Sequence, residues 1–206
     1  HEDEPCRRLV TQGIVNGPDG RKMSKRWGNV VTPGPMVDRF GADTLRLFIL
    51  FAAPPEKDID WSDEQVDGLF RFLARVWRLF HARQDCFRAP EAALAQAAGD
   101  FLELRRRTHR TLKRVTEGFG ERAQGQPGET TPERAGGPAP GSPRGDDLKF
   151  NTGIAALMEL VNALYALEPK ADADRAAVRE ALVALATLLA PFAPHVAEEL
   201  WHEVLG

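Results

Sequence analysis

The sequence predicts a mainly α-helical protein in which a small strand-turn-helix element precedes an α-helical bundle. Over most of residues 61–206, apolar side chains recur at intervals of three and four, which is the period of an amphipathic helix. Near the start, Leu9–Val15 has the composition of a short strand. With 206 residues, of which 43% are hydrophobic, the chain can bury a sizeable core.

After this strand, the front of the chain is expected to turn and then form two short helices. The letters NGPDG favour a turn, and VTPGP opens a helix that ends near Phe40. A second helix is predicted from about Gly41 to Phe51. It stops before Pro54 and Pro55, because proline lacks the amide hydrogen that a helix needs.

The bundle is predicted to begin after DIDW with a long amphipathic helix. Ser62 and Gln65 form a capping box, in which each side chain can satisfy an amide of the first turn. The apolar residues of this helix are Val66, Leu69, Phe70, Leu73, Val76, Trp77 and Phe80. At about 100° per residue, Arg71, Arg75 and Arg78 lie on the opposite side.

Further helices are predicted along the rest of the chain. One spans roughly Ala95–Glu117, carries LRRRTHRTLKR on its surface and buries Phe101, Leu104, Leu112 and Val115. The next is capped by Asn151 and turns inward Ile154, Leu157, Met158, Val161, Leu164 and Tyr165. A last pair follows, broken at PFAP.

Between these blocks, residues 118–147 contain 8 Gly and 5 Pro, and Phe119 is their only large apolar side chain. Such a composition cannot repay the entropy of ordering. We therefore expect a flexible Gly/Pro-rich linker or surface insertion at about 118–147.

Composition excludes several classes of protein. The net charge of -3 argues against a protein that coats nucleic acid by bulk electrostatics, so any polyanion contact is expected to be local. Cys6 and Cys86 form no C-x-x-C pair, which argues against a thiolate zinc site or a disulfide framework and favours a reducing cytoplasm. No apolar run approaches the roughly 18 residues of a membrane span. The start, HEDEPCRRLV, is no signal peptide and lacks an initiator methionine, so the chain is interpreted as a piece of a longer protein.

One cluster of possible metal ligands lies near the end of the chain. His195, Glu198, Glu199 and His202 have the spacing of one helical face. Because no H-E-x-x-H motif is present, a solvated helix end is the preferred interpretation and no metal site is predicted.

The stretch GRKMSKRWGN, residues 20–29, places four cations between glycines. Its spacing is not that of a Walker loop, and composition alone leaves a solvated turn and an anion-binding loop both open. The order KMSK, followed by Gly28, Asn29 and then GADTLRL, resembles the second signature of class I aminoacyl-tRNA synthetases. In that family the signature is a mobile loop that closes over ATP.

The resemblance narrows to the bacterial-type leucyl enzymes. TQGIV, FGADTLRLFILFAAPPEKDIDWSD, FRFLARVWRLF, FNTGIAALMELVNALYAL and LLAPFAPHVAEELW are all similar to segments of those enzymes, in the same order. The resemblance implies the C-terminal part of a class I catalytic domain over residues 1–60 and a helical bundle like an anticodon-binding domain over 61–206. The family's first signature, of the His-Ile-Gly-His type, is not found, so only half of an ATP site is expected here.

The resemblance implies a leucine–tRNA ligase activity: ATP-dependent activation of leucine and its transfer to tRNA(Leu). Lys25 corresponds to the principal pyrophosphate lysine and Lys22 to its helper, and both are catalytic candidates. Met23 and Ser24 would shape the nucleotide contact, and ATP would arrive with its Mg²⁺.

The stretch departs from the family pattern after Lys25. Arg26 stands where serine is usual, and Trp27 stands where a small or cationic residue is common. Arg26 is therefore a further ATP-binding candidate, which either binds phosphate in place of the hydroxyl or is tolerated at some cost in rate.

The expected partners are tRNA(Leu), ATP, leucine and the remainder of a synthetase chain, in a cytoplasmic monomer without membrane contact. The candidates for tRNA binding are Arg71, Arg75, Arg78, Arg105, Arg106, Arg110 and Lys113. Two alternatives stay open: a catalytically inactive helical RNA-binding module derived from a class I synthetase, and an interaction bundle whose basic faces only solubilise it.

Overall fold

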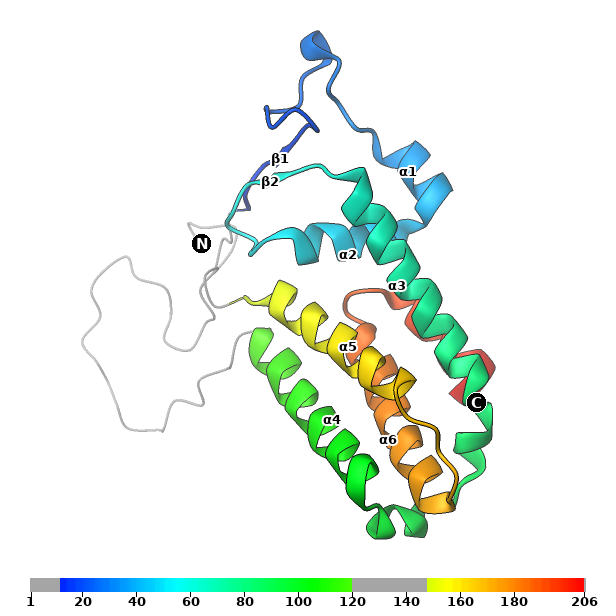
Figure 1. The fold of residues 1–206 in the computed structure, drawn as a ribbon. Helices are drawn as coiled ribbons and strands as arrows, with labels where there is room; N and C mark the ends of the chain where they lie inside the picture. The colour runs from blue at the N-terminus through cyan, green and yellow to red at the C-terminus, as the bar shows by residue number, and fades with distance from the viewer. Residues whose placement is uncertain (1–11, 120–147, 206) are drawn as a thin grey trace, which may run out of the picture.

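The computed structural model describes residues 12–119 and 148–205, and their architecture is mainly α-helical, as predicted (Figure 1). At one end lies a parallel pair of two-residue strands, β1 (Val15–Asn16) and β2 (Ile59–Asp60). Of the predicted strand Leu9–Val15, residues 9–11 lie outside the described residues. Of residues 12–15, only Val15 belongs to β1, so the prediction of a strand was wrong for residues 12–14. Two short helices, α1 (Pro33–Phe40) and α2 (Ala42–Ala52), lead from this end toward the bundle, in agreement with the prediction.

The bundle consists of four long helices and a short terminal one. They are α3 (Asp63–Ala82), α4 (Gly99–Gly118), α5 (Phe150–Tyr165), α6 (Asp172–Leu189) and α7 (Pro194–Leu200). Figure 1 shows α3 and α4 on opposite sides, with α5 and α6 between them. Two 3₁₀ helices, Gln84–Arg88 and Glu91–Gln96, join α3 to α4, and a π-helical turn, Trp201–Leu205, follows α7. The start of α4 therefore lies later than the predicted Ala95.

The buried faces of the bundle helices differ from the prediction at individual positions. On α3, Phe70 is 43% exposed, whereas Phe72 and Leu79 are buried, because α3 contacts α2 on one side and α5 and α7 on others. On α4, Leu112 is exposed and Thr111 is buried instead. Small side chains on this face fit the close packing of α4 against α5 and α6.

Two helix starts were predicted from polar residues, with different outcomes. The Ser62 hydroxyl accepts a hydrogen bond from the Gln65 amide at 3.3 Å, which confirms that half of the capping box. Asn151 does not cap α5, because the helix begins at Phe150 and Asn151 lies inside its first turn. The Asn151 side chain accepts a hydrogen bond from the Thr152 amide at 2.9 Å.

The ends of α4 and α5 are joined directly. The Lys149 amide donates to the Gly118 carbonyl at 2.9 Å, and the Phe119 ring packs against those of Phe150 and Phe192, at centroid distances of 5.2 and 5.4 Å. The prediction of an insertion starting at 118 was wrong for its first two residues, which belong to the bundle. The remainder, 120–147, lies outside the described residues.

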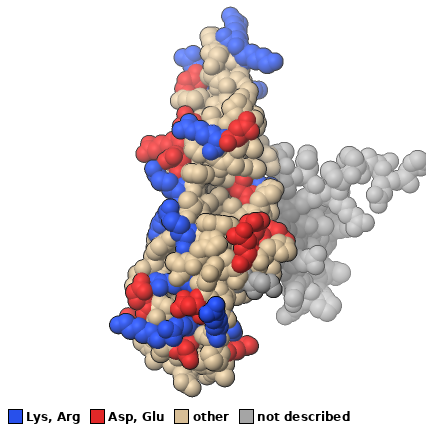
Figure 2. Space-filling view, turned by 90° about the vertical axis from the view of Figure 1, so that its right-hand side faces the viewer, with Lys and Arg blue, Asp and Glu red and all other residues tan. Residues whose placement is uncertain are grey.

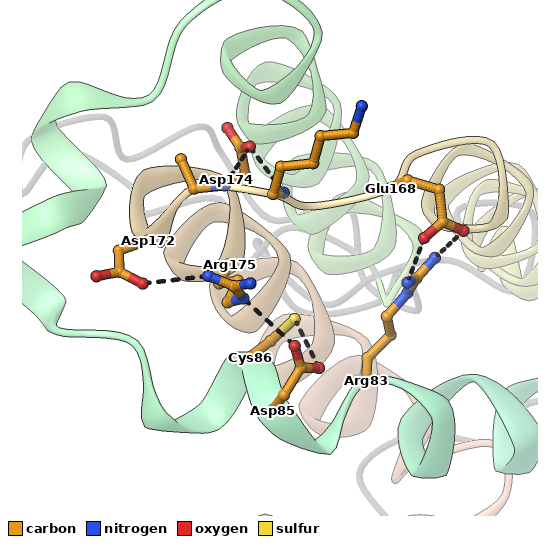
Figure 3. Close-up of polar contacts among 9 residues, drawn as sticks. Arg83, Asp85, Cys86, Glu168, Asp172, Asp174 and Arg175 are labelled. Carbon is orange, nitrogen blue, oxygen red and sulfur yellow. Dashed lines mark hydrogen bonds and ion pairs between the residues drawn. The ribbon is translucent and has the colours of Figure 1, made fainter.

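The end of the bundle far from β1 and β2 is closed by charged side chains (Figure 3). The Arg83 guanidinium donates to both carboxylate oxygens of Glu168, at 2.9 and 3.0 Å. This pairing raises the pKa of Arg83 and lowers that of Glu168. Arg175 on α6 donates from Nε to one carboxylate oxygen of Asp85 at 3.3 Å, beside the buried Cys86, whose pKa is raised by burial to about 11. These contacts join the end of α3 to the connection between α5 and α6, and the following 3₁₀ turn to α6.

Candidate functional site

The stretch GRKMSKRWGN forms a loop at the tip of the molecule, held in shape by its own backbone. The Gly17 amide donates to the Arg21 carbonyl at 2.8 Å, and Asn16 and Lys22 form an isolated antiparallel bridge. The loop therefore leaves β1 as a narrow hairpin whose first cations, Arg21 and Lys22, are exposed.

Asn29 closes this loop from inside. Its side-chain oxygen accepts from the Ser24 amide at 2.8 Å, and its side-chain nitrogen donates to Asp19 Oδ1 at 2.9 Å. The bond from Asn29 lowers the pKa of Asp19, which therefore stays charged. A Cβ on Gly17 would lie 2.8 Å from the Asn29 carbonyl oxygen, so only glycine fits this approach. The sequence indicated Asn29 only as part of a motif and not as the residue that fastens the loop.

Lys25 lies in a short 3₁₀ turn, Lys25–Trp27, with defined caps at both ends. The Ser24 hydroxyl accepts a hydrogen bond from the Arg26 amide at 3.3 Å. Gly28 ends the turn with φ 65°, a left-handed conformation that favours glycine. The Ser24 hydroxyl thus has a structural partner in its own loop, and the turn displays the side chains of Lys25 and Arg26 outward.

The four cations of the loop, Arg21, Lys22, Lys25 and Arg26, are all exposed, whereas Met23 is half-buried. None of the four forms an ion pair with a carboxylate of residues 12–119 or 148–205. Figure 2 shows blue side chains gathered at this tip of the molecule. Unpaired cations on a fixed backbone make this loop a candidate site for a polyanionic ligand.

The motif GADTLR fastens the front of the chain to the end of the bundle. The Asp43 carboxylate, which is 4% exposed, accepts from the Val196 amide at 2.7 Å and lies 2.8 Å from Nδ1 of His195. On the same helix, the Arg46 guanidinium donates to the Pro191 carbonyl at 3.1 Å. These contacts join α2 to the connection between α6 and α7 and to the first turn of α7.

Comparison with known proteins finds family matches at both ends of the chain. Residues 1–62 match the family model of class I tRNA synthetases (I, L, M and V), and residues 145–206 match that of the anticodon-binding domain of tRNA ligase. Over 98% of its length the chain is 46% identical to a leucine–tRNA ligase of Syntrophobacter fumaroxidans and 47% identical to one of Geobacter sp. strain M21. The chain belongs to the class I tRNA synthetase family. It spans 22% of the length of these relatives.

Solved synthetase structures share the fold. A LeuRS from Agrobacterium radiobacter K84, determined as a ternary complex with tRNA and LeuAMS, matches 97% of this synthetase chain, with 32% identity and a TM-score of 0.74. The match covers 23% of that structure's chain. Methionyl-tRNA synthetase of Mycobacterium tuberculosis, bound to methionyl-adenylate, matches 92% of the chain and 36% of its own at a TM-score of 0.58. Its 19% identity supports the fold alone.

On α3 of this synthetase chain, the three predicted arginines do not form one solvated row. Arg71 and Arg78 are exposed, and Arg71 pairs with Asp67 one turn earlier, at 2.6 Å. Arg75 instead reaches across to α5, where it donates to Asn162 Oδ1 at 2.8 Å and lies 5.0 Å from the centroid of the Tyr165 ring. The prediction that Arg75 points away from the packed face was wrong, because α5 crosses α3 at this position.

Tyr165 completes this contact. Its side chain was predicted to point inward, but it is 40% exposed, and its hydroxyl donates to the Arg75 carbonyl at 2.8 Å. Arg75 and Tyr165 therefore hold α3 against α5.

On α4, one of the four predicted residues is also used inside the protein. The Arg105 side chain donates to Glu180 on α6 at 2.8 Å and is 27% exposed. Arg106 and Arg110 share the carboxylate of Glu103 on the exposed side. The fourth residue, Lys113, is 76% exposed and lies 3.5 Å from Glu117.

The four possible metal ligands near the end of the chain do not converge on one point. His195 contacts Asp43, as described above, and His202, in the π-helical turn after α7, lies 3.1 Å from Glu198 one turn earlier. Within the described ranges, no group of three or more His, Cys, Asp or Glu residues is placed to hold a metal ion. The four side chains are exposed, in agreement with the preferred interpretation of a solvated helix end, but His195 also contacts the buried carboxylate of Asp43.

Among the helices of residues 12–119 and 148–205, none is long and apolar enough to cross a membrane.

Proposed function

We propose that this chain is the part of a leucine–tRNA ligase that carries the lysine loop and the helical tRNA-binding bundle. The observation that carries the proposal is the loop at residues 20–29, with four exposed cations and no carboxylate partner among the described residues. The leucine–tRNA ligases that match 98% of the chain support the choice of amino acid. The division into residues 1–60 and 61–206 remains our interpretation of its domains.

In the proposed reaction, the carboxylate oxygen of leucine attacks the α-phosphorus of ATP. The bond from this phosphorus to the bridging oxygen breaks, and the electron pair leaves with pyrophosphate. The loop cations would stabilise this leaving charge, with Lys25 as the principal residue and Lys22 as its helper. One charge pair near 4 Å contributes roughly 4 kcal/mol at an effective dielectric of about 20, before desolvation. Mg²⁺ would arrive with the ATP phosphates as part of the substrate.

Lysines that contact pyrophosphate accelerate the reaction only insofar as they bind the transition state more strongly than the ground state. The cap by Ser24 and the anchor by Asn29 support this role, because they fix the backbone from which Lys25 extends. Met23, half-buried beside Ser24, would contact the nucleotide through its apolar side chain. Arg26 extends from the same turn and adds a fourth cation.

The activation proposal is tested in the complete synthetase by leucine-dependent exchange between ATP and pyrophosphate. Lys25→Ala is expected to lower the rate constant by about 10² or more, with a smaller effect on leucine affinity. Lys57→Ala, which removes an exposed lysine of the same front region, serves as the control and should change neither. An unchanged rate for Lys25→Ala would exclude the proposed role. Under this proposal, the isolated 206-residue chain should show no exchange, because the family's first signature is not found in its sequence.

For the bundle, we propose that α4 contacts the phosphate backbone of tRNA. This helix carries six cations and three carboxylates, whereas α3 carries three of each. Figure 1 places the two helices on opposite sides of the bundle, so one straight RNA segment would contact only one of them. The higher positive charge favours α4, with Arg106, Arg110 and Lys113 as the exposed candidates among those predicted.

Salt dependence of tRNA affinity tests this assignment in the complete synthetase. Each lost phosphate contact lowers the slope of log affinity against log salt by about 0.7 to 0.9. A triple change of Arg106, Arg110 and Lys113 to Gln should therefore flatten the slope by up to about 2 to 3. The change of Arg71 and Arg78 to Gln on α3 is the matched control and should leave this slope unchanged. If only the α3 variant flattened the slope, the tRNA contact would be assigned to α3. If neither variant changed the slope, both helix faces would be solvated surfaces without a tRNA contact.

A further inference from the structure

Trp27 is an exposed aromatic side chain at the tip of the lysine loop. Its residue is 58% exposed, more than any other large hydrophobic residue that the structure describes. An indole in water contributes nothing to a core, so its presence at the end of a charged loop calls for another explanation. The side chains next to the ring suggest that explanation, because two of them are guanidinium groups.

Two arginines lie over the indole ring. The guanidinium carbon of Arg26 is 5.3 Å from the ring centroid, and that of Arg21 is 5.9 Å from it. Arg21 directly precedes Lys22, which forms the bridge with Asn16, whereas Arg26 belongs to the 3₁₀ turn. The indole ring therefore contacts side chains from two parts of the loop. Cations are attracted to the electron-rich face of an indole within about 6 Å of its centroid.

This arrangement gathers positive charge at the end of the loop. The two guanidinium groups and the ammonium groups of Lys22 and Lys25 have no ion pair with a carboxylate within residues 12–119 and 148–205. Like charges repel, so gathering them is unfavourable until an anion binds. A guanidinium also presents a planar fork of donors that matches two oxygens of a phosphate, which a single serine hydroxyl cannot do.

We propose that Trp27 is a positioning residue, which holds Arg21 and Arg26 so that their guanidinium groups bind the triphosphate of ATP beside Lys22 and Lys25. This inference rests on the proposed function of the loop. It assigns Arg21 to the ATP site and explains how Arg26 can stand where a hydroxyl is usual. The indole restricts the two long side chains before ATP binds, so less freedom is lost on binding.

The test uses exchange between ATP and pyrophosphate in the complete synthetase, measured over a range of ATP concentrations. Trp27→Ala is expected to raise the KM for ATP and to lower kcat/KM by about 5- to 10-fold. Trp27→Phe keeps an aromatic face and should recover most of this loss. Arg21→Gln and Arg26→Gln should each lower kcat/KM for ATP. Thermal melts of each variant check that the loop changes leave the fold intact.

A double-mutant cycle separates positioning from an independent contact. If Trp27 acts through Arg26, Trp27→Ala should cost clearly less in the Arg26→Gln background than in the wild type. The inference would be overturned if Trp27→Ala lowered kcat/KM for ATP by the same factor in both backgrounds. It would also be overturned if Trp27→Ala left the KM and kcat/KM for ATP unchanged. Normal exchange with poor charging of tRNA by Trp27→Ala would overturn it as well, because the indole would then contact RNA and would not hold cations for ATP.

The result for Lys25→Ala separates this inference from the function on which it rests. If Lys25→Ala abolishes exchange and Trp27→Ala does not affect it, only the role of Trp27 is excluded. If neither change affects exchange, the ATP site itself has been assigned wrongly.

Discussion

The buried carboxylate of Asp43 should be among the polar groups on which the stability of this chain depends most. It accepts the Val196 amide at 2.7 Å in the first turn of α7, where Ala193 at the N-cap position has no side chain that could replace it. Loss of a helix cap costs about 0.5–2 kcal/mol, and a hydrogen bond to a charged group contributes about 1.5–3 kcal/mol. Asp43→Ala should therefore destabilise the chain by about 2–4 kcal/mol, since it also removes the contact with His195.

Urea unfolding of the 206-residue chain measures this loss as a shift of the midpoint at unchanged m-value. In thermal melts, a chain of this size loses roughly 2–4 °C per kcal/mol, so Tm should fall by about 5–15 °C. Asp43→Asn keeps an acceptor for the Val196 amide and should cost only about 1 kcal/mol.

Asp38→Ala, at an exposed position on α1, is the matched control and should change stability by less than about 0.5 kcal/mol. If Asp43→Ala were as mild as this control, the contact between α2 and α7 would not carry the energy that its geometry indicates. The reasoning from burial and distance would then be refuted at this site.

Three further outcomes are expected for the same chain. Arg75→Gln should destabilise it by about 1–2 kcal/mol in urea unfolding, because Arg75 holds α3 to α5, whereas the exposed Arg78→Gln should stay within about 0.5 kcal/mol. Replacing 120–147 by a short Gly-Ser linker should move Tm by only a few degrees, since loop-closure entropy changes slowly with length; a large drop would show that the segment packs on the bundle. In a Cys6→Ser background, the Cys86 thiol, with its pKa raised to about 11, should resist a thiol reagent at pH 8 until the chain unfolds. Because the folded state retains this proton, the stability linked to Cys86 is present below pH 9 and is lost as the pH rises toward 11.

Helix positions and the lysine loop could be predicted because both are local in sequence. The period of apolar residues defines α2, α3, α5 and α6, and the order of residues in KMSK carries the family signature. The strand pair was harder, because β1 and β2 are two residues each and lie far apart in the chain. Short strands of this kind are set by tertiary contacts and carry almost no periodic signal.

The roles of individual polar residues could not be predicted, because they depend on partners distant in sequence. Arg75 and Arg78 occupy similar positions on a helical wheel, yet only Arg75 meets α5, at a residue 87 positions away. Asp43 and His195 are 152 positions apart. A single helix shows which of its faces is apolar, but not which neighbour crosses the polar one.

The direct bond between Lys149 and Gly118 has a consequence for how this chain can be divided. Because the backbone closes at these two residues, the bundle does not rely on the intervening stretch to bring α4 and α5 together. A cut between 120 and 147 would leave two polypeptides, each with part of one shared core, that should reassemble on mixing as a split protein. The same opening offers new termini for a circular permutation, far in sequence from the lysine loop and on a different part of the fold.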